Sequence, residues 1–137
     1  MVKEVAFKDI QVGDTAELSK TITESDIHTF AGISMDFNPV HVNEEFAQKS
    51  RFKQRVAHGM LTASMLSAVI GTVLPGKNTI YLTQSLKFTH PVFIGDTVTA
   101  KVTVKEKKDK GILVLDTTVL NQEGSVVLEG EAKVMKD

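Results

Sequence analysis

The sequence predicts an α+β fold in which about five strands, mainly antiparallel and strongly curved, wrap around one long central helix. Residues 59–74 are apolar on almost every side of a helix, and residues 80–134 contain segments in which apolar and polar residues alternate. Only short turns separate these segments, and short turns join antiparallel neighbours. A helix with so little polar surface needs a sheet to cover it.

Length and composition fit one soluble globular domain that spans residues 1–137. Hydrophobic residues make up 42% of the chain, charged residues make up 24%, and the formal net charge is -1. This balance provides no general attraction to nucleic acids or to anionic membranes. The chain has no cysteine, which excludes disulfides, thiolate catalysis and cysteine-ligated metal sites.

The sequence predicts no membrane segment. Its longest apolar stretch, residues 60–74, is interrupted by Ser, Thr and Gly and is shorter than the roughly 20 residues of a membrane span. The first seven residues lack the long apolar core of a signal peptide. We therefore expect a cytoplasmic protein.

A strand and two short helices are predicted before the central helix. Residues 15–22 follow a turn and have the length and composition of a first strand. Thr23 is placed to cap an amphipathic helix that runs to Ser34, with acidic residues in its first turn. Asn43 resembles a second cap, ahead of another short helix. His28 has no evident partner, so we expect it at the surface.

The central helix is predicted over residues 59–74 and is stopped by Pro75-Gly76. Larger apolar residues cover one side of it, and small residues at helical spacing cover another. We expect the helix to be buried almost all round. The stripe of small residues consists of Met60, Ala63, Ser64, Ser67, Ala68 and Gly71.

Four strand segments follow the central helix. Apolar and polar residues alternate over residues 80–88, with a break at Gln84, and over residues 97–104 without a break. Two further turns lead to the segments 112–120 and 126–134. The apolar face predicted for the first of these segments consists of Ile80, Leu82, Leu86 and Phe88.

Asp36 and His41 are the candidate catalytic residues. They lie five residues apart around an Asn-Pro pair, which predicts a fixed turn that can aim both side chains at one point. A carboxylate and an imidazole that converge on one water molecule can move protons at neutral pH. The residues alone also allow a simpler interpretation, because Asp, Asn and Pro are ordinary turn residues.

Three segments resemble the MaoC-like, (R)-specific enoyl-CoA hydratases, also called hydratase 2. Residues 36–41, with Ala47 six residues later, are similar to the signature of that family. Residues 57–61 are similar to the start of its central helix, and residues 88–96 match a strand, a turn and the next strand. The resemblance implies a hot dog fold and a homodimer, or a dimer of dimers, in which two protomers pair their sheets edge to edge.

The resemblance also implies the reaction, which is the reversible addition of water to a trans-2-enoyl-CoA to give an (R)-3-hydroxyacyl-CoA. The protein would then be a hydro-lyase whose partner is an acyl-CoA thioester, with coenzyme A as part of the substrate and no further cofactor or metal. Asp36 and His41 would hold the water between them, and either could act as base or acid. The amide of Gly59, at the N-terminus of the central helix, is the expected oxyanion donor, although Gly59 could instead ease the loop into the helix.

Three further residues are candidates for substrate binding. Asn38 stiffens the turn or orients the catalytic water, and His58 supports the geometry of the loop. Ser67 matches a family serine that has a polar or acyl-pocket role. Alternatively, Ser67 is a small buried serine whose hydroxyl donates a hydrogen bond to its own helix. The basic residues before the central helix form a solvated connection, or else one or two of them bind the phosphates of coenzyme A. These residues are Lys49, Arg51, Lys53 and Arg55.

Two other functions remain open at the level of the sequence. Hot dog acyl-CoA thioesterases bind the same substrate class and hydrolyse it, and a catalytically silent subunit would only bind acyl-CoA. The arrangement of Asp36, Asn38, Pro39 and His41 favours hydration over both.

Overall fold

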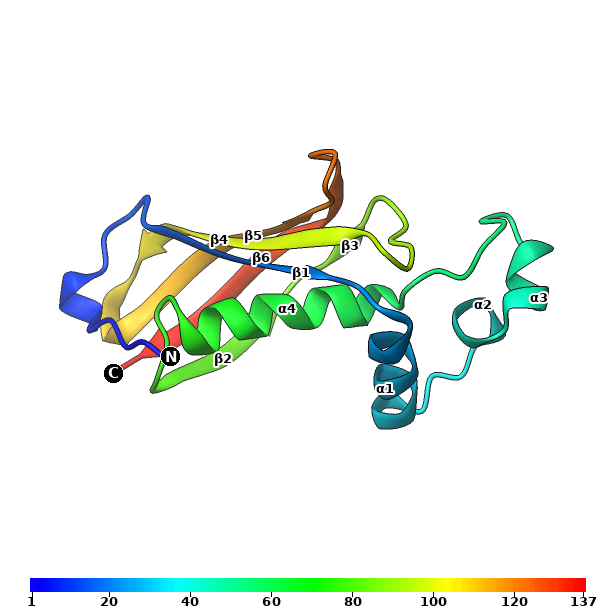
Figure 1. Cartoon of the computed structure of the whole chain (residues 1–137). Coiled ribbons are helices and arrows are strands. Elements are labelled where there is room, and N and C mark those ends of the chain that lie inside the picture. Colours follow the sequence, from blue (N-terminus) through cyan, green and yellow to red (C-terminus); the bar gives the residue numbers. More distant parts are fainter.

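The computed structural model describes residues 1–137. An antiparallel sheet lies along one long helix, and three shorter helices lie beyond the N-terminal end of that helix (Figure 1). The helices are α1 (Glu24–Ser34), α2 (Pro39–Val42), α3 (Glu44–Gln48) and α4 (Gly59–Thr72), with 3₁₀ turns η1 (Phe7–Asp9) and η2 (Asp109–Gly111). The strands are β1 (Thr15–Thr21), β2 (Thr79–Gln84), β3 (Lys87–Phe88), β4 (Thr97–Lys107), β5 (Ile112–Leu120) and β6 (Val126–Lys136).

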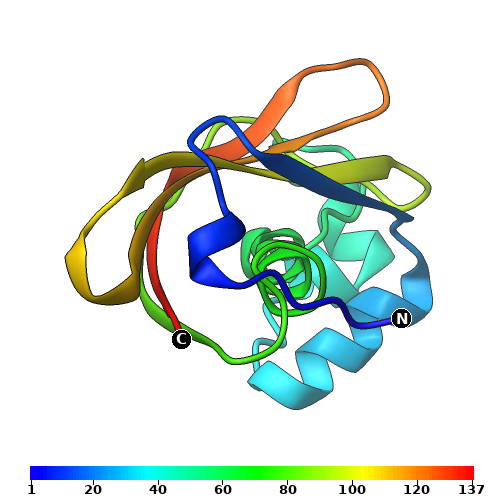
Figure 2. The ribbon, with the colours of Figure 1, turned by 90° about the vertical axis from the view of Figure 1, so that its left-hand side faces the viewer.

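The strands form one sheet in the order β1-β4-β5-β6-β2, and the two-residue β3 also pairs with β6. All of these pairings are antiparallel. Seen along α4, the sheet curves around the helix (Figure 2). The predicted α+β fold is confirmed, with one short strand more than expected because residues 80–88 divide after Gln84 into β2 and β3.

Alternation in the sequence correctly predicts the buried face of β4. Val98, Ala100, Val102 and Val104 are all buried, and the residues between them are exposed or half-buried. Each buried valine contributes about 1.5–3 kcal/mol relative to an exposed one. These side chains face α4, which contacts β4 more than any other strand.

The predicted cap of α1 is also present. The Thr23 hydroxyl accepts a hydrogen bond from the Asp26 amide at 3.1 Å, and the Asp26 carboxylate accepts one from the Thr23 amide at 2.9 Å. This capping box fixes the start of α1. At the other end Met35 adopts a left-handed conformation with φ of 68°, which ends the helix and turns the chain toward Asp36.

The Asn-Pro pair begins a helix, whereas the sequence predicted only a turn. The Asn38 side chain accepts a hydrogen bond from the Val40 amide at 3.3 Å, and Pro39 occupies the first position of α2. Proline suits that position because its missing N–H would be unpaired there anyway. His41 therefore lies within a helical turn.

The expectation that α4 is buried all round is wrong for one chain. Its sheet-facing side is buried, but most of the small-residue stripe is exposed. The sequence indicated that this face is apolar and could not show whether the same chain covers it. The exposed members of the stripe are Met60, Ser64, Ser67, Ala68 and Gly71.

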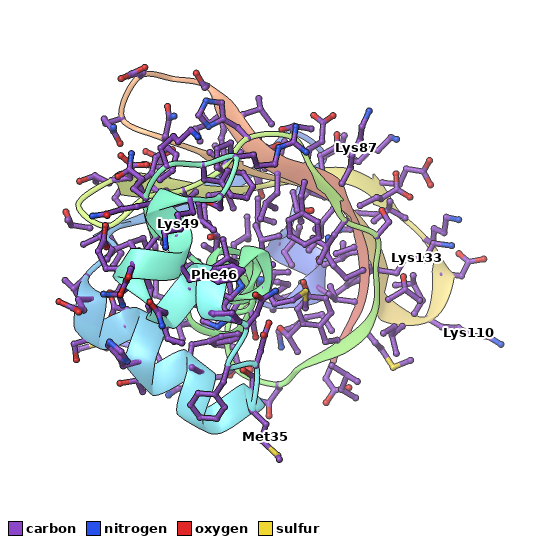
Figure 3. The ribbon with its side chains drawn as sticks, turned by 90° about the vertical axis from the view of Figure 1, so that its right-hand side faces the viewer. Met35, Phe46, Lys49, Lys87, Lys110 and Lys133 are labelled. Carbon is purple, nitrogen blue, oxygen red and sulfur yellow. The ribbon has the colours of Figure 1, made fainter.

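The predicted apolar face of the first segment after α4 is likewise exposed. Ile80 and Leu82 of β2 are 52% and 45% exposed, and Phe88 of β3 is 51% exposed. β2 is an edge strand, so no further strand covers it. Met35 and Phe46 are exposed as well. Met35 points away from the body of the protein (Figure 3).

No helix has both the length and the apolar character needed to cross a membrane. The longest, α4, has 14 residues. The cytoplasmic location stays a prediction.

Candidate active site

The predicted catalytic residues lie where α1, α2 and the N-terminus of α4 meet. Asp36 is in the connection from α1 to α2, and His41 is the third residue of α2. His58 is the N-cap of α4, and Gly59 is its first residue. The structure therefore brings together side chains from the connection between α1 and α2, from α2 and from the start of α4.

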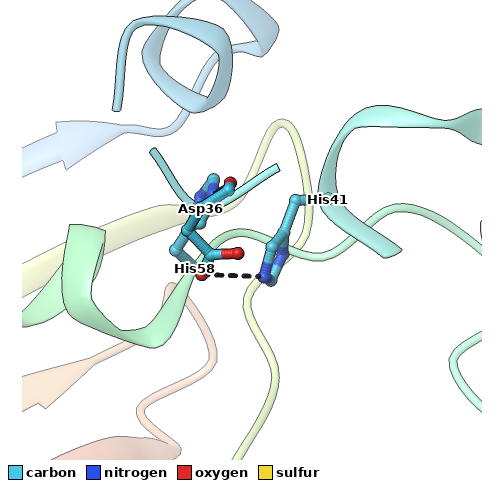
Figure 4. Close-up of side chains that lie close together, drawn as sticks. All are labelled: Asp36, His41 and His58. Atoms are coloured by element: carbon cyan, nitrogen blue, oxygen red, sulfur yellow. Dashed lines mark hydrogen bonds and ion pairs between the residues drawn. The ribbon is translucent and has the colours of Figure 1, made fainter. Parts of the chain in front are cut away.

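The imidazole of His41 is held by the main chain and directed at Asp36. Its Nδ1 lies 2.7 Å from the carbonyl oxygen of Val56. A carbonyl can only accept, so Nδ1 carries the proton and the neutral ring has an unprotonated Nε2. That Nε2 lies 3.9 Å from Oδ2 of Asp36 (Figure 4).

Hydrogen bonds within the turn hold Asp36 in position. Its Oδ1 accepts a hydrogen bond from the Asn38 amide at 3.1 Å, and the Asp36 amide donates to the Ser34 hydroxyl at 3.2 Å. The side chain remains 51% exposed, so Oδ2 is accessible on the side that faces His41. Asn38 thus acts here as a cap and turn residue.

Burial lowers the pKa of His41 below its ordinary value of 6.5. The hydrogen bond to Val56 raises this pKa, the neighbouring His58 lowers it, and Asp36 raises it, but desolvation is the largest contribution. The net effect favours the neutral imidazole at neutral pH. His41 is thereby kept in the form that can accept a proton at Nε2.

His58 holds the two candidate residues in place. It is only 2% exposed, and its Nε2 lies 2.9 Å from the carbonyl oxygen of Asp36. Its ring stacks on His41 with centroids 3.9 Å apart and packs at a tilt against Phe30 at 4.9 Å. These contacts connect the loop that carries Asp36 to α1 and α2. Its Nδ1 is buried and has no hydrogen-bond partner.

The cluster of Asp36, His41 and His58 does not suit a metal ion. Each residue offers one ligand atom, and these atoms lie within 4.8 Å of one another. A metal lies in the plane of each imidazole that binds it, but the two rings are stacked with only 27° between their planes. Their lone pairs therefore cannot converge on one ion, and the arrangement fits proton transfer better.

A cavity of about 580 Å³ lies beside His41 and reaches Gly59. It is large enough for a small ligand and is mostly apolar, with His41, Arg51 and His90 as its titratable residues. Its wall consists of Asn38, Val40, His41, Arg51, Phe52, Val56, Ala57, Gly59, Met60, Thr62, Phe88, Thr89, His90, Pro91, Val92, Val127 and Leu128.

Gly59 combines free backbone donors with close packing. The amides of Gly59 and Met60, at the start of α4, have no backbone acceptor. A Cβ atom on Gly59 would lie 2.7 Å from two ring carbons of Phe88. Only glycine therefore fits under Phe88 in this arrangement.

Ser67 does not join the other candidates. It lies on the exposed stripe of α4 and is absent from the cavity wall. Within one chain, Ser67 therefore does not line an acyl pocket. Ser67 is eight residues past Gly59, about two helical turns, which carries it beyond the cavity.

Arg55 is wrongly predicted as a solvated or phosphate-binding residue. Its side chain is buried at 7% exposure and is bonded to Glu24 at 2.6 Å and to His28 at 3.2 Å. His28 is exposed, as expected, but it has a partner that its neighbours in the sequence did not indicate. Glu24 is 31 positions away in the sequence, so no local pattern could indicate the pair. Arg51 is the basic residue that reaches the cavity.

The curved antiparallel sheet on a central helix defines a hot dog protein, in which Asp36 and His41 face each other near the N-terminus of that helix. The chain belongs to the MaoC like domain family, whose model matches residues 9–124.

Related proteins cover nearly the whole chain. It is 57% identical to an (R)-specific enoyl-CoA hydratase of Rhodospirillum rubrum, over 94% of this chain and 90% of that protein. The structure is similar to the unliganded R-hydratase PhaJ1 of Pseudomonas aeruginosa, with a TM-score of 0.95 and 44% identity over 98% of this chain and 87% of the other. It is also similar to the (R)-hydratase of Aeromonas caviae, with a TM-score of 0.92 and 44% identity over 95% and 99% of the two chains.

Proposed function

We propose that the protein is an (R)-specific enoyl-CoA hydratase, a hydro-lyase that adds water reversibly to trans-2-enoyl-CoA and forms (R)-3-hydroxyacyl-CoA. The observation that carries this proposal is that His41, which faces Asp36, lines a cavity whose wall also includes Gly59, the first residue of α4. The identity to a hydratase over nearly the full length of both chains supports it.

Asp36 and His41 hold the reacting water between them in this proposal. With Nε2 and Oδ2 3.9 Å apart, a water oxygen about 2.8 Å from each would see them at an angle of about 90°. That angle is close enough to tetrahedral for the water to donate one hydrogen bond to each atom. The water oxygen then points its lone pairs at the β-carbon of the substrate.

His41 takes the proton in our assignment, because its Nε2 is unprotonated in the neutral ring. The hydroxyl adds to the β-carbon, and the proton is delivered to the α-carbon from the resulting imidazolium. Asp36 orients the water and stabilises the imidazolium while it exists. Water and proton thus add from the same side of the double bond.

Gly59 is the proposed oxyanion donor. Negative charge builds up on the thioester oxygen between the two steps, and the free amide at the start of α4 can donate a hydrogen bond to it. Arg51 is the proposed contact for a phosphate of coenzyme A, because it is exposed and lines the cavity while Arg55 is already bonded.

The test is an assay of the purified protein with enoyl-CoA thioesters of increasing length. We expect the conjugated enoyl absorbance to fall without release of free thiol, and the product to be the (R)-3-hydroxyacyl-CoA. Free thiol from a saturated acyl-CoA would instead identify a thioesterase. Binding without any turnover would identify a silent acyl-CoA-binding subunit.

We also propose that two copies of the chain form a homodimer, itself able to form a dimer of dimers. β2 exposes both an unpaired strand edge and the apolar side chains of Ile80 and Leu82. Such edges and apolar patches are typical of protein interfaces. A second copy that pairs β2 with β2 would also cover the exposed stripe of α4, including Ser67.

Leu82→Lys is expected to convert the dimer into a monomer, because it places a charge in the proposed interface. Leu18→Lys is a matched control, since Leu18 is 38% exposed on β1, the edge strand at the other end of the sheet. Analytical ultracentrifugation measures both. A wild-type protein that sediments as a single chain, or equal dissociation in both variants, contradicts the proposed interface.

A further inference from the structure

Arg55 is a buried cation that joins the two helices of the candidate site. It lies in the connection from α3 to α4 and is only 7% exposed. Its Nη1 donates to the Glu24 carboxylate at 2.6 Å, and its Nη2 donates to Nε2 of His28 at 3.2 Å. Both partners lie on α1. The charge of the buried Arg55 is therefore compensated by an exposed carboxylate of the same chain.

The third contact of Arg55 is with the candidate base itself. Its Nε donates to the carbonyl oxygen of His41 at 2.7 Å. His41 is near the end of α2, a helix of four residues, where the last carbonyls have no partner within the helix. Arg55 supplies the missing donor to a turn that is too short to be stable alone.

The residue after Arg55 completes the attachment. The Val56 carbonyl accepts the hydrogen bond from Nδ1 of His41 at 2.7 Å, and the Val56 amide donates to the Val40 carbonyl at 3.3 Å. Two adjacent residues thus hold both the main chain and the ring of His41. Arg55 extends this attachment by hydrogen bonds to α1, whose C-terminal end leads to Asp36. The ring of His58, which stacks on His41 and packs against Phe30, adds a contact without a hydrogen bond to α1.

We propose that Arg55 is a positioning residue that sets the separation of His41 and Asp36 by joining α1 to α2. Its three directed N–H groups bind two partners on α1 and one on α2 at the same time, which a lysine cannot reproduce. This role rests on the proposed catalytic pair. Arg55 itself is not part of the cavity wall.

Arg55→Met is expected to lower kcat about 100-fold, as a misplacement of about 1 Å at a reacting group does, while KM changes less than about threefold. Arg55→Lys keeps the charge but not the fork, so we expect it to recover part of the loss. Arg51→Met gives the opposite pattern, with a raised KM and little change in kcat, because Arg51 lines the cavity.

Lys136→Met controls for the loss of a buried cation. The Lys136 side chain is 2% exposed and pairs with Glu4 at 3.1 Å, far from the site, near the two chain termini (Figure 1). We expect this variant to lower the melting temperature without lowering kcat. The proposal is overturned if Arg55→Met behaves like Lys136→Met, or if it raises KM alone.

A second readout separates this proposal from the proposed function. The Nδ1 proton of His41 is observable by nuclear magnetic resonance because it is hydrogen-bonded to Val56. We expect its signal to shift or broaden in Arg55→Met and to stay in place in Lys136→Met. If the wild type has no hydratase activity, the proposed function fails, and this signal still decides on Arg55: an unchanged signal overturns the positioning role.

Discussion

His41→Gln and Asp36→Asn are each expected to lower kcat by about 10³-fold, within the range that general acid–base catalysis contributes. Glutamine cannot take a proton at neutral pH. Asparagine can still accept the hydrogen bond from the Asn38 amide, so the turn should persist without the negative charge. Because both groups act on one water, the double variant should be little slower than the slower single variant.

Binding must be retained for this result to concern chemistry. Titration calorimetry with a saturated acyl-CoA is expected to give the same affinity for both variants and the wild type. Asp109→Asn, which removes an exposed carboxylate in η2, is the control and should keep full activity. Turnover that survives in both His41→Gln and Asp36→Asn contradicts the proposed mechanism.

Local patterns in the sequence predict most of the fold because they report local physics. The cap at Thr23 requires only Asp26 three residues later, and both hydrogen bonds of the capping box form. The alternation over residues 97–104 requires only that one face of a strand is buried, and β4 buries that face. Prediction is most accurate where sequence neighbours determine the structure.

One chain leaves part of α4 and β2 exposed, and there the sequence predicts more burial than the structure has. The apolar residues of the small stripe and of β2 are correctly identified, but one protomer leaves them exposed. An apolar surface is expected to become covered, but its composition does not indicate which segment or which protein covers it. The proposed dimer explains why Ile80 and Leu82 are apolar at a sheet edge.

The candidate site was predictable where its residues are close in the sequence. Asp36 and His41 are five residues apart, and the turn between them brings their side chains within 3.9 Å. The stack of His58 on His41 and the attachment of Arg55 to Glu24 join residues 17 and 31 positions apart. Contacts of that kind depend on how the helices pack, which no local spacing indicates.

Gly59→Ala is expected to lower kcat about 100-fold, the loss caused by removing one oxyanion donor. The backbone at Gly59 is not in the left-handed region, and alanine favours helices, so the helix itself accepts alanine. The new methyl group would lie 2.7 Å from the ring of Phe88 and beside the free amide. It should therefore displace the ring and keep the thioester oxygen away from the N–H group.

A double variant distinguishes the oxyanion role of Gly59 from simple packing. Phe88→Ala removes the ring that a methyl group at Gly59 would contact. If Gly59 serves only to avoid that contact or to ease the chain into α4, adding Phe88→Ala to Gly59→Ala should restore kcat to that of Phe88→Ala alone. We expect no such recovery, because the methyl group still shields the amide. Two ratios of kcat, measured under saturating substrate, are compared: Gly59→Ala to wild type, and the double variant to Phe88→Ala. Equal ratios assign Gly59 to the reaction, and a ratio near one for the second pair assigns it to the packing of the helix start.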